Sequence, residues 1–379
     1  MTEQMHFIVE NGALAKALVY LNGIVRKVAT IPILTHVAVE TAGDKEILVR
    51  ANNLDRETEA RMPAEVMKAG AAALPGERLQ ALAKRLTRGG QCEVSLVNDR
   101  AHLVAGSSTY DLRTLPIADF PGKISASEPV EFSLSAAELR AMIKSVAYAA
   151  LGTGIERHYL QGVNLHVSGE KLITVATDTV RLAVKSCPLP DGAAEMPRVT
   201  VPTEAASAMV DILKDVEGDA ELAVSPQLIE LRLPNLRLAS SLISGDFPDY
   251  QRAMPAINGA AARFRVSALA EAVARVDVVR LSDVNKRATI LRLTTRDGAI
   301  CLEAGAAAGD QALEIVEAET SGCSFSFGVV ADYLAEMLDV WPGDAELGVQ
   351  QSSPSSPILF MADERPSESH LIMPSVLKS

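Results

Sequence analysis

Hydrophobic residues recur every three or four positions in six separate stretches of the chain, and this spacing predicts six amphipathic helices. Between them, shorter stretches alternate apolar and polar residues, which is typical of half-buried strands. Each third of the chain has one helix near its start and one near its middle. The helices are expected at residues 11–25, 75–86, 134–148, 202–213, 266–279 and 329–341.

The order of these elements repeats three times along the 379 residues. Leu14, Leu139 and Leu269 hold the same place in the first helix of each third and lie 125 and 130 residues apart. A fixed period of this length indicates tandem copies of one structural unit. We therefore expect an α+β protein with three similar domains, at residues 1–125, 126–256 and 257–379.

A proline-braced segment, Asp-Phe-Pro-Asp-Tyr at 246–250, follows the last predicted strand of the second third. Pro248 fixes its own φ and biases the preceding residue towards an extended conformation, so this connector is expected to be stiff. A shorter copy, Asp-Phe-Pro, stands at 119–121. Taken alone, such a segment fits a plain crossover between domains. The aromatic Tyr250 close to Arg252 also suits a surface that holds a ligand.

Composition places the chain among soluble globular proteins, with 48% hydrophobic and 22% charged residues. No run of about 18 apolar residues predicts a membrane helix. The N-terminus lacks the basic start and apolar block of a secretory signal, so a cytoplasmic location is expected. The four cysteines show no metal-type spacing, and we expect neither a metal nor a cofactor.

Candidate catalytic groups are scattered along the chain. The six histidines form no ligand pair, and neither a Walker loop nor a nucleophile elbow is present. The carboxylates are dispersed as solvated charges usually are. An enzyme is therefore not expected.

The formal net charge is −12, which taken globally disfavours a nucleic-acid binder. The six predicted helices with their flanking loops nevertheless total +3, with +3 on residues 75–88 and −3 on 329–341, so the remainder carries −15. Helices that face an anionic polymer would show this bias, whereas helix faces that are merely solvated would not. Charge alone therefore suggests four DNA-contacting residues: Arg78, Lys84, Arg85 and Arg88.

Several short motifs, in a fixed order, resemble those of the bacterial DNA sliding clamp family, the β subunits of the replicative polymerase. The resemblance extends over the whole chain. It rests on Thr-Ile-Pro-Ile-Leu at 30–34, Leu-Pro at 115–116, Asp-Phe-Pro at 119–121, Arg-His-Tyr-Leu at 157–160, Ala-Thr-Asp at 176–178, Arg-Leu-Ala at 181–183, Phe-Pro-Asp-Tyr at 247–250 and Met-Pro at 373–374.

This resemblance implies a head-to-tail homodimer that closes into a ring around duplex DNA, with helices lining the channel and antiparallel sheets outside. Such a clamp tethers the replicative polymerase and clamp-loader subunits through short peptide motifs, and it catalyses no reaction. The resemblance places Leu112 and Leu281 at the dimer interface. It adds candidate DNA contacts at Arg26, Lys27, Arg157, His158 and Tyr159.

A partner-peptide groove between the second and third domains is also implied. Thr179 and Val180 replace the Gly-His pair usual in the family, and because a β-branched residue resists positive φ, we expect a reshaped turn there. The C-terminal tail departs from the family pattern as well. The residues expected in the groove are Leu160, Thr177, Thr179, Val180, Arg181, Leu182, Pro248, Arg252, Ala253, Val330, Tyr333, Ser356, Ile372, Met373, Pro374, Ser375, Val376 and Leu377.

Two alternatives to a general replicative clamp stay open at this point. A specialised or accessory clamp would keep the ring but change its choice of partner. A clamp-fold protein with another ligand would not bind DNA at all.

Overall fold

The structure, a computed structural model, describes residues 3–152, 154, 156–257, 259–278, 290–305, 310–321 and 324–375. Its contacts divide the chain into two compact units, which we treat separately. The first unit comprises residues 1–139, 190–197 and 207–242, and the second comprises 140–189, 198–206 and 243–379. No helix among the described residues is long and apolar enough to cross a membrane.

Each third of the chain follows one order: strand, helix, four strands, helix, three strands. The first repeat contains β1 (Glu3–Glu10), α1 (Asn11–Val19), β2 (His36–Ala42), β3 (Glu46–Asn52), β4 (Arg56–Lys68), β5 (Ala71–Pro75), α2 (Gly76–Ala83), β6 (Gln91–Val97), β7 (Arg100–Ala105) and β8 (Ser108–Arg113). The second contains β9 (Val130–Ser135), α3 (Ala136–Ala147), β10 (Gly162–Ser168), β11 (Lys171–Thr177), β12 (Arg181–Pro188), β13 (Val199–Pro202), α4 (Thr203–Ile212), β14 (Asp219–Val224), β15 (Leu228–Leu233) and β16 (Leu236–Ser241).

Among its described residues, the third repeat adds a two-residue strand, β21 (Glu319–Thr320), to this order. It contains β17 (Ala262–Arg265), α5 (Val266–Val276), β18 (Ile290–Arg296), β19 (Ala299–Gly305), β20 (Gln311–Glu317), β22 (Ser326–Val330), α6 (Ala331–Asp339), β23 (Glu346–Gln350), β24 (Ile358–Met361) and β25 (Glu368–Ile372). The six helices and the threefold order expected from the periodicity are thus confirmed.

Local capping explains where α1 begins. The Glu10 carboxylate accepts hydrogen bonds from the amides of Gly12 and Ala13 at 2.8 and 2.6 Å, and these bonds lower the pKa of Glu10. The helix ends at Val19, short of the predicted residue 25, because the chain continues in tight turns and Gly23 adopts a φ of 75°.

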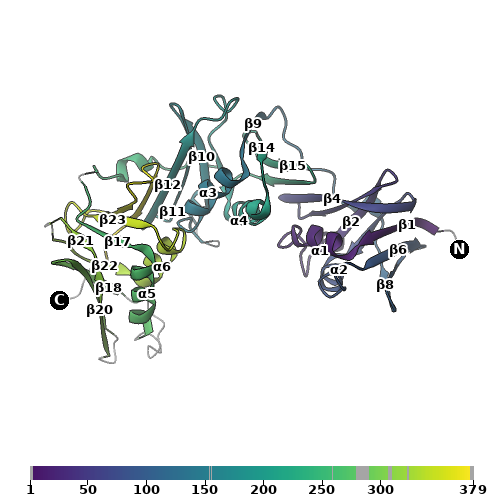
Figure 1. Cartoon of the computed structure of the whole chain (residues 1–379). Helices are drawn as coiled ribbons and strands as arrows, with labels where there is room; N and C mark the ends of the chain where they lie inside the picture. Colours follow the sequence, from purple (N-terminus) through teal and green to yellow (C-terminus); the bar gives the residue numbers. More distant parts are fainter. Residues whose placement is uncertain are drawn as a thin grey trace. The chain divides into compact units, whose positions relative to one another are not determined.

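In the first unit, twelve strands form one antiparallel sheet along the path β8-β7-β6-β1-β4-β16-β15-β14-β9, with β2, β3 and β5 beside it. Strand β4 of the first repeat pairs with β16 of the second, so the two repeats share a sheet. Helices α1 and α2 lie together against the first repeat's strands (Figure 1) and bury Leu14, Leu18 and Leu79 in its core.

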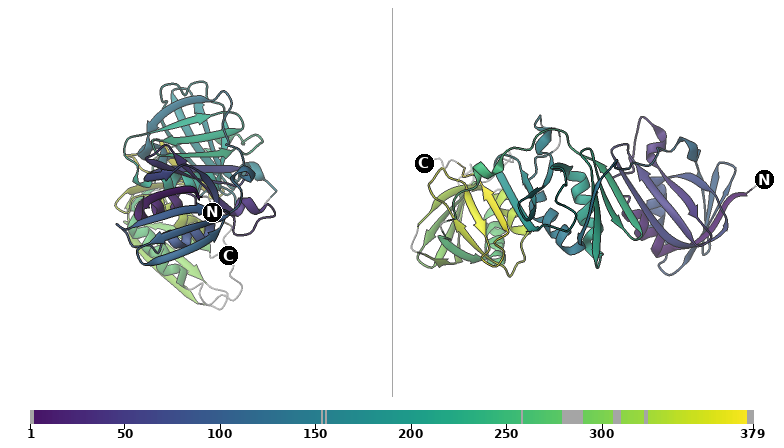
Figure 2. Two further views of the ribbon diagram at one scale, coloured as in Figure 1. Left: turned by 90° about the vertical axis from the view of Figure 1, so that its right-hand side faces the viewer. Right: turned by 90° about the horizontal axis from the view of Figure 1, so that it is seen from above.

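In the second unit, nine strands follow the path β13-β10-β11-β12-β25-β24-β23-β17-β21, and a separate sheet follows β20-β19-β18-β22. Here β12 of the second repeat pairs with β25 of the third. Helices α5 and α6 pack side by side, and the strands of the third repeat, green to yellow in Figure 2, adjoin them. The joint between repeats is therefore built by the same strand positions in both units.

Candidate functional site

The turn between β11 and β12 is held by its own side chains. Asp178 Oδ1 accepts hydrogen bonds from the amides of Val180 and Arg181 at 2.9 and 2.6 Å. Thr177 Oγ1 accepts one from the Thr179 amide at 3.0 Å. This network places Thr179 at a φ of 80°, a left-handed conformation that β-branched residues rarely adopt.

The first repeat contains the same turn between β3 and β4. Asn53 accepts from the amides of Asp55 and Arg56, and Asn52 accepts from the Leu54 amide at 2.7 Å. Leu54 has a φ of 81°. Thr179 thus adopts the left-handed conformation that a β-branched residue is expected to resist, because side-chain acceptors impose it, at a cost of roughly 1–2 kcal/mol.

Replacing Thr179 with glycine is expected to raise the free energy of unfolding by about 1 kcal/mol, since glycine adopts positive φ without a Cβ clash. Val180→Gly is the matched control: Val180 lies in the same turn but is not among the positive-φ residues. We expect no gain there. Chemical denaturation of both variants measures the difference, and equal stability of parent and Thr179→Gly would show that the turn holds no strain.

Arg181 anchors the end of this turn. Its guanidinium contacts Asp178 at 2.9 Å, pairs with Glu336 of α6, and lies 4.4 Å from the ring centroid of Tyr333 and 5.6 Å from that of Tyr148. Burial alone would lower the pKa of Arg181, but the two carboxylates outweigh it and raise that pKa. Arg181 is thus a fixed cation that connects the turn to α6.

An apolar surface lies beside the turn on one face of the nine-stranded sheet. Leu182 on β12 is opposite Leu371 on β25, which is opposite Leu359 on β24. A second row begins with Val175 opposite Val184. We call this cluster, with the connector side chains that cover it, the platform: Leu160, Val175, Leu182, Val184, Phe247, Tyr250, Leu359, Met361 and Leu371.

The connector after β16 lies on the platform through its aromatic side chains. Phe247 and Tyr250 are both buried, and the Tyr250 hydroxyl is 3.3 Å from His166 Nε2. Pro248 and Arg252 are exposed, and Arg252 pairs with Asp249 at 2.9 Å. The connector thus buries apolar groups and leaves its charged groups in solvent.

The structure brings most of the predicted groove residues together in the second unit. The Met373 amide donates to the carbonyl of Val180 at 2.8 Å, so the C-terminal segment runs beside the turn. Of the others, Leu160, Thr177 and Ile372 are buried, whereas Ala253 and Met373 are exposed and Val330, Pro374 and Ser375 are partly buried.

The remaining groove predictions are Ser356, Val376 and Leu377. The Ser356 hydroxyl is hydrogen-bonded within its own loop, to Ser353 at 2.6 Å. Val376 and Leu377 lie outside the described residues.

Sequence reasoning missed five strand residues of the platform: Val175, Val184, Leu359, Met361 and Leu371. Each lies in a strand whose sequence indicates a buried, purely structural position. Period-2 alternation gives the face of a residue but not the strand beside it.

The basic residues predicted from charge are exposed on the helical side of the first unit. Arg78, Lys84, Arg85 and Arg88 all face solvent. Lys84 and Arg88 line a groove of about 730 Å³ together with Lys16 of α1. Asp211 and Asp215 also line it, so the groove is basic but not uniformly so.

The loop candidates are exposed as well. Arg26 and Lys27 follow α1 in the first unit. Arg157 and His158 are exposed in the second unit, and the Tyr159 ring packs edge-on against His158, with centroids 6.0 Å apart.

Each described sheet path ends in strands with a single neighbour, and β8 and β20 are two of these end strands. Strand β8 closes the twelve-stranded path, and β20 closes the four-stranded one. Leu112 on β8 packs partly into the first-repeat core, and β20 exposes Leu313 and Ile315. Leu281 lies outside the described residues.

This architecture is that of a repeat protein built from shared sheets. Three copies of one α+β unit share sheets, and no three His, Cys, Asp or Glu side chains within the described ranges are placed to hold a metal. Such a molecule has the architecture of a three-domain clamp, a class defined by its fold and not by a reaction.

Comparison with known proteins gives the family. Models of the DNA polymerase III β subunit match residues 5–125 (N-terminal domain), 133–249 (central domain) and 251–376 (C-terminal domain). The β sliding clamp of Caulobacter vibrioides is 30% identical over 376 residues, 98% of this chain and 99% of that one. That of Escherichia coli is 27% identical over 336 residues, 88% and 90% of the two chains. The chain belongs to the bacterial β sliding clamp family.

Solved structures agree with this assignment. A Bartonella birtlesii sliding clamp, bound to griselimycin, superposes with a TM-score of 0.90 at 26% identity and covers 98% of this chain and 100% of that one. A Caulobacter crescentus clamp, with polyethylene glycol at its proposed β-motif tethering region, gives 0.87 at 29% identity with the same coverage. Proteins of this family are processivity factors of DNA polymerase III and carry out no catalysis.

Proposed function

We propose that two copies of this chain join head to tail into a ring around duplex DNA, and that the ring tethers DNA polymerase III and clamp-loader subunits through the platform. The observation that carries the proposal is that two kinds of surface lie on different elements of the chain. Exposed cations lie on the helical side, and the apolar platform lies on a sheet. A protein that acts on chromosomal DNA would work in the cytoplasm.

Open sheet edges support the dimer. Strand β8 and strand β20 each present unpaired backbone groups, which proteins seldom leave exposed. Pairing β8 of one copy with β20 of the other would satisfy both edges and cover Leu313 and Ile315. The same pairing, used twice, closes a ring of six domains. Leu112 and Leu281 stay the proposed interface residues.

Circular and linearised DNA test the ring. A clamp loaded onto a closed circle is expected to remain bound through gel filtration at moderate salt, because leaving requires the ring to open. Cutting the circle should release it, since the ring can slide off an end. Equal loss from both forms would contradict encirclement and favour a clamp-fold protein with another ligand.

The DNA contacts we propose are weak and numerous. They comprise Arg26, Lys27, Arg78, Lys84, Arg85, Arg88, Arg157, His158 and Tyr159. A topological link holds DNA without tight contacts, and strong phosphate contacts would hinder sliding. Acidic residues among the basic ones, such as Asp211 and Asp215, fit this requirement.

Changing Lys84, Arg85 and Arg88 together to alanine is expected to weaken residual DNA binding and flatten its salt dependence. Each phosphate contact contributes about 0.9 to the slope of log K against log salt, so the slope should fall by up to about 3. A matched control changes Lys45, Lys171 and Arg296, exposed cations at strand ends. Binding assays at several salt concentrations compare the two, and equal slopes would place the helix away from DNA.

The platform supports the tethering role. Apolar peptide side chains need an apolar surface with an accessible rim, and Pro248, Met373 and Val180 are exposed around this one. We propose as its ligand a short peptide with a glutamine followed by a Leu-Phe-like pair. A specialised clamp is the second candidate, favoured by the strained threonine at Thr179 next to this rim.

A further inference from the structure

A buried charged network in the first unit corresponds, position by position, to the platform. The two left-handed residues, Leu54 and Thr179, fix the alignment because each lies in the same hydrogen-bonded turn. Glu57 lies three residues after Leu54, as Leu182 lies three after Thr179.

Sheet register extends this correspondence across the joint between repeats. In the first unit, Glu57 is opposite Ala239, and Ala239 is opposite Glu230. The same steps in the second unit run from Leu182 to Leu371 and then to Leu359. In the neighbouring row, Val175, Val184 and Ser369 of the second unit correspond to Arg50, Glu59 and Arg237 of the first. Met361, two residues after Leu359, corresponds to Arg232, two residues after Glu230.

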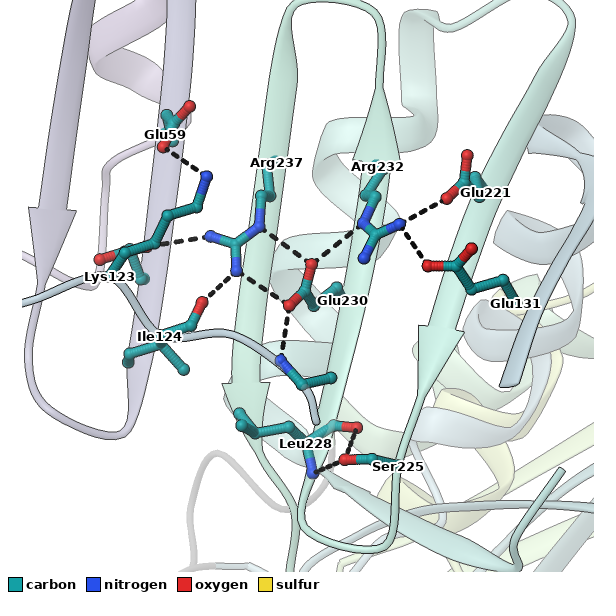
Figure 3. Close-up of polar contacts among 12 residues, drawn as sticks. Glu59, Lys123, Ile124, Glu131, Glu221, Ser225, Leu228, Glu230, Arg232 and Arg237 are labelled. Atoms are coloured by element: carbon teal, nitrogen blue, oxygen red, sulfur yellow. Dashed lines mark hydrogen bonds and ion pairs between the residues drawn. The ribbon is translucent and has the colours of Figure 1, made fainter. Parts of the chain in front are cut away.

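The carboxylates of this network are buried, the arginines are partly buried, and the two are paired with one another. Arg237 contacts Glu57 at 3.0 Å. Arg237 and Arg232 each contact Glu230 at 3.0 Å (Figure 3). Arg50 contacts Glu57 from the other side at 3.2 Å. Glu57 is 0% and Glu230 2% exposed, so the expectation that the carboxylates are solvated is wrong for these two.

The segment that follows β8 and contains the Asp-Phe-Pro copy, residues 119–126, is the first connector. It crosses this network, and its main chain is hydrogen-bonded to it. Arg50 donates to the carbonyl of Pro121 at 2.9 Å, and Arg237 donates to that of Ile124 (Figure 3). The amide of Ala126 donates to Glu230 Oε1 at 2.8 Å. Directional, charge-assisted hydrogen bonds therefore hold residues 121–126 in place.

Both connectors bury a phenylalanine, Phe120 with its ring centroid 4.9 Å from the Arg50 guanidinium and Phe247 in the platform, but their other contacts differ. The second connector contacts its sheet through the side chains of Phe247, Tyr250 and Met254, which pack in the platform cluster. Apolar contacts of this kind are not directional, so other apolar side chains can take their place. A charged surface offers no such exchange, because an incoming apolar group would have to desolvate it.

We propose that the network of Arg50, Glu57, Glu230 and Arg237 excludes partner peptides from the first unit, by binding the chain's own connector at the position that takes peptides in the second unit. Each chain then offers one peptide site although its fold contains the position twice. The inference rests on the proposed role of the platform. In this proposal, the four charged residues determine which of the two equivalent positions binds a peptide.

Exchanging the network for the platform's residues tests the proposal. The exchange variant carries Arg50→Val, Glu57→Leu, Glu59→Val, Glu230→Leu, Arg232→Met and Arg237→Ser, which removes three cations and three anions and keeps the net charge at −12. Buried ion networks often tolerate replacement by apolar residues of similar size. Fluorescence anisotropy with a labelled peptide carrying a glutamine and a Leu-Phe pair is expected to show one site in the parent and two in the variant.

Adding Leu182→Glu to the exchange variant locates the second site. That change is intended to block the platform, so any binding left must come from the first unit. Two sites in the unaltered parent would overturn the proposal. A folded exchange variant that still binds one peptide per chain would overturn it as well.

Hydrogen exchange tests the bound connector without any peptide and without a multiple variant. The Ala126 amide is expected to exchange about 100-fold more slowly than an unprotected amide, and Glu230→Gln should speed it up. Saturating peptide should leave its rate unchanged. Unprotected exchange at Ala126, or slowing by peptide, would contradict the proposal. If the parent binds no peptide while Ala126 is protected, the role proposed for the platform fails and the bound connector stands.

Discussion

Replacing Leu182 with glutamate is expected to weaken binding of the glutamine-containing peptide at least 100-fold. Leu182 lies in the middle of the platform, with Leu371 and Leu359 across the adjoining strands. An apolar peptide side chain placed there would strip water from the new carboxylate, at a cost of about 3 kcal/mol or more. Fluorescence anisotropy with the labelled peptide measures the loss.

Leu182 is 5% exposed, and Val175 and Ser369 stand where the arginines that pair with Glu57 stand in the first unit, so the new carboxylate is expected to lower the melting temperature as well. The melting temperature is therefore measured together with the affinity. Val278→Glu is the control, since Val278 is 60% exposed at the end of α5 in the same unit and lies outside the platform. It adds the same charge and should leave affinity unchanged. If Leu182→Glu binds as the parent does while its melting temperature is normal, the platform is not the peptide site.

Replacing Arg237 with methionine is expected to lower the free energy of unfolding by about 3 kcal/mol. Methionine has a similar length but cannot donate, so Glu57 and Glu230 lose a partner inside the protein while remaining charged. The connector also loses the hydrogen bond to the carbonyl of Ile124. Urea denaturation followed by circular dichroism measures the change at neutral pH.

Arg263→Met is the matched control for this prediction. Arg263 pairs with Asp363 at 2.8 Å, but both side chains are solvent-exposed. An exposed pair contributes at most about 1 kcal/mol, so this variant should lose far less. Equal losses of unfolding free energy in the two variants would show that the buried pairs of Arg237 contribute no more stability than an exposed pair.

Acid should reduce the effect of Arg237→Met. Burial alone would raise the pKa of Glu230, but hydrogen bonds from Arg237, the Ala126 amide and Arg232 outweigh it and lower the pKa from 4.5 to about 2. A lowered folded-state pKa contributes stability above the unfolded value, and that contribution is lost as pH falls from 4.5 towards 2. The parent and the variant should therefore converge in this range, and a constant difference down to pH 2 would exclude the charge on Glu230 as the cause.

Residue pattern alone determined the local structure and the family. Each helix follows from the spacing of side chains such as Leu14 and Leu18, because one face of a helix is set by near neighbours in the chain. The threefold order follows for the same reason, as do the motifs at 119–121 and 247–250. The resemblance to sliding clamps needed nothing beyond these local features and their order.

Only the tertiary structure decided which residues make a site. Leu182 and Leu371 are 189 residues apart in the chain and directly opposite in the sheet. Alternation places each on a face, but the identity of its cross-strand neighbour depends on which distant strands pair and in which register. Strand pairing in the first unit likewise brings Glu57 and Glu230 together in a buried network, although in the sequence they look like ordinary surface charges. Thr179 makes the point locally, because three hydrogen bonds in the folded turn overrule the conformational preference of its side chain.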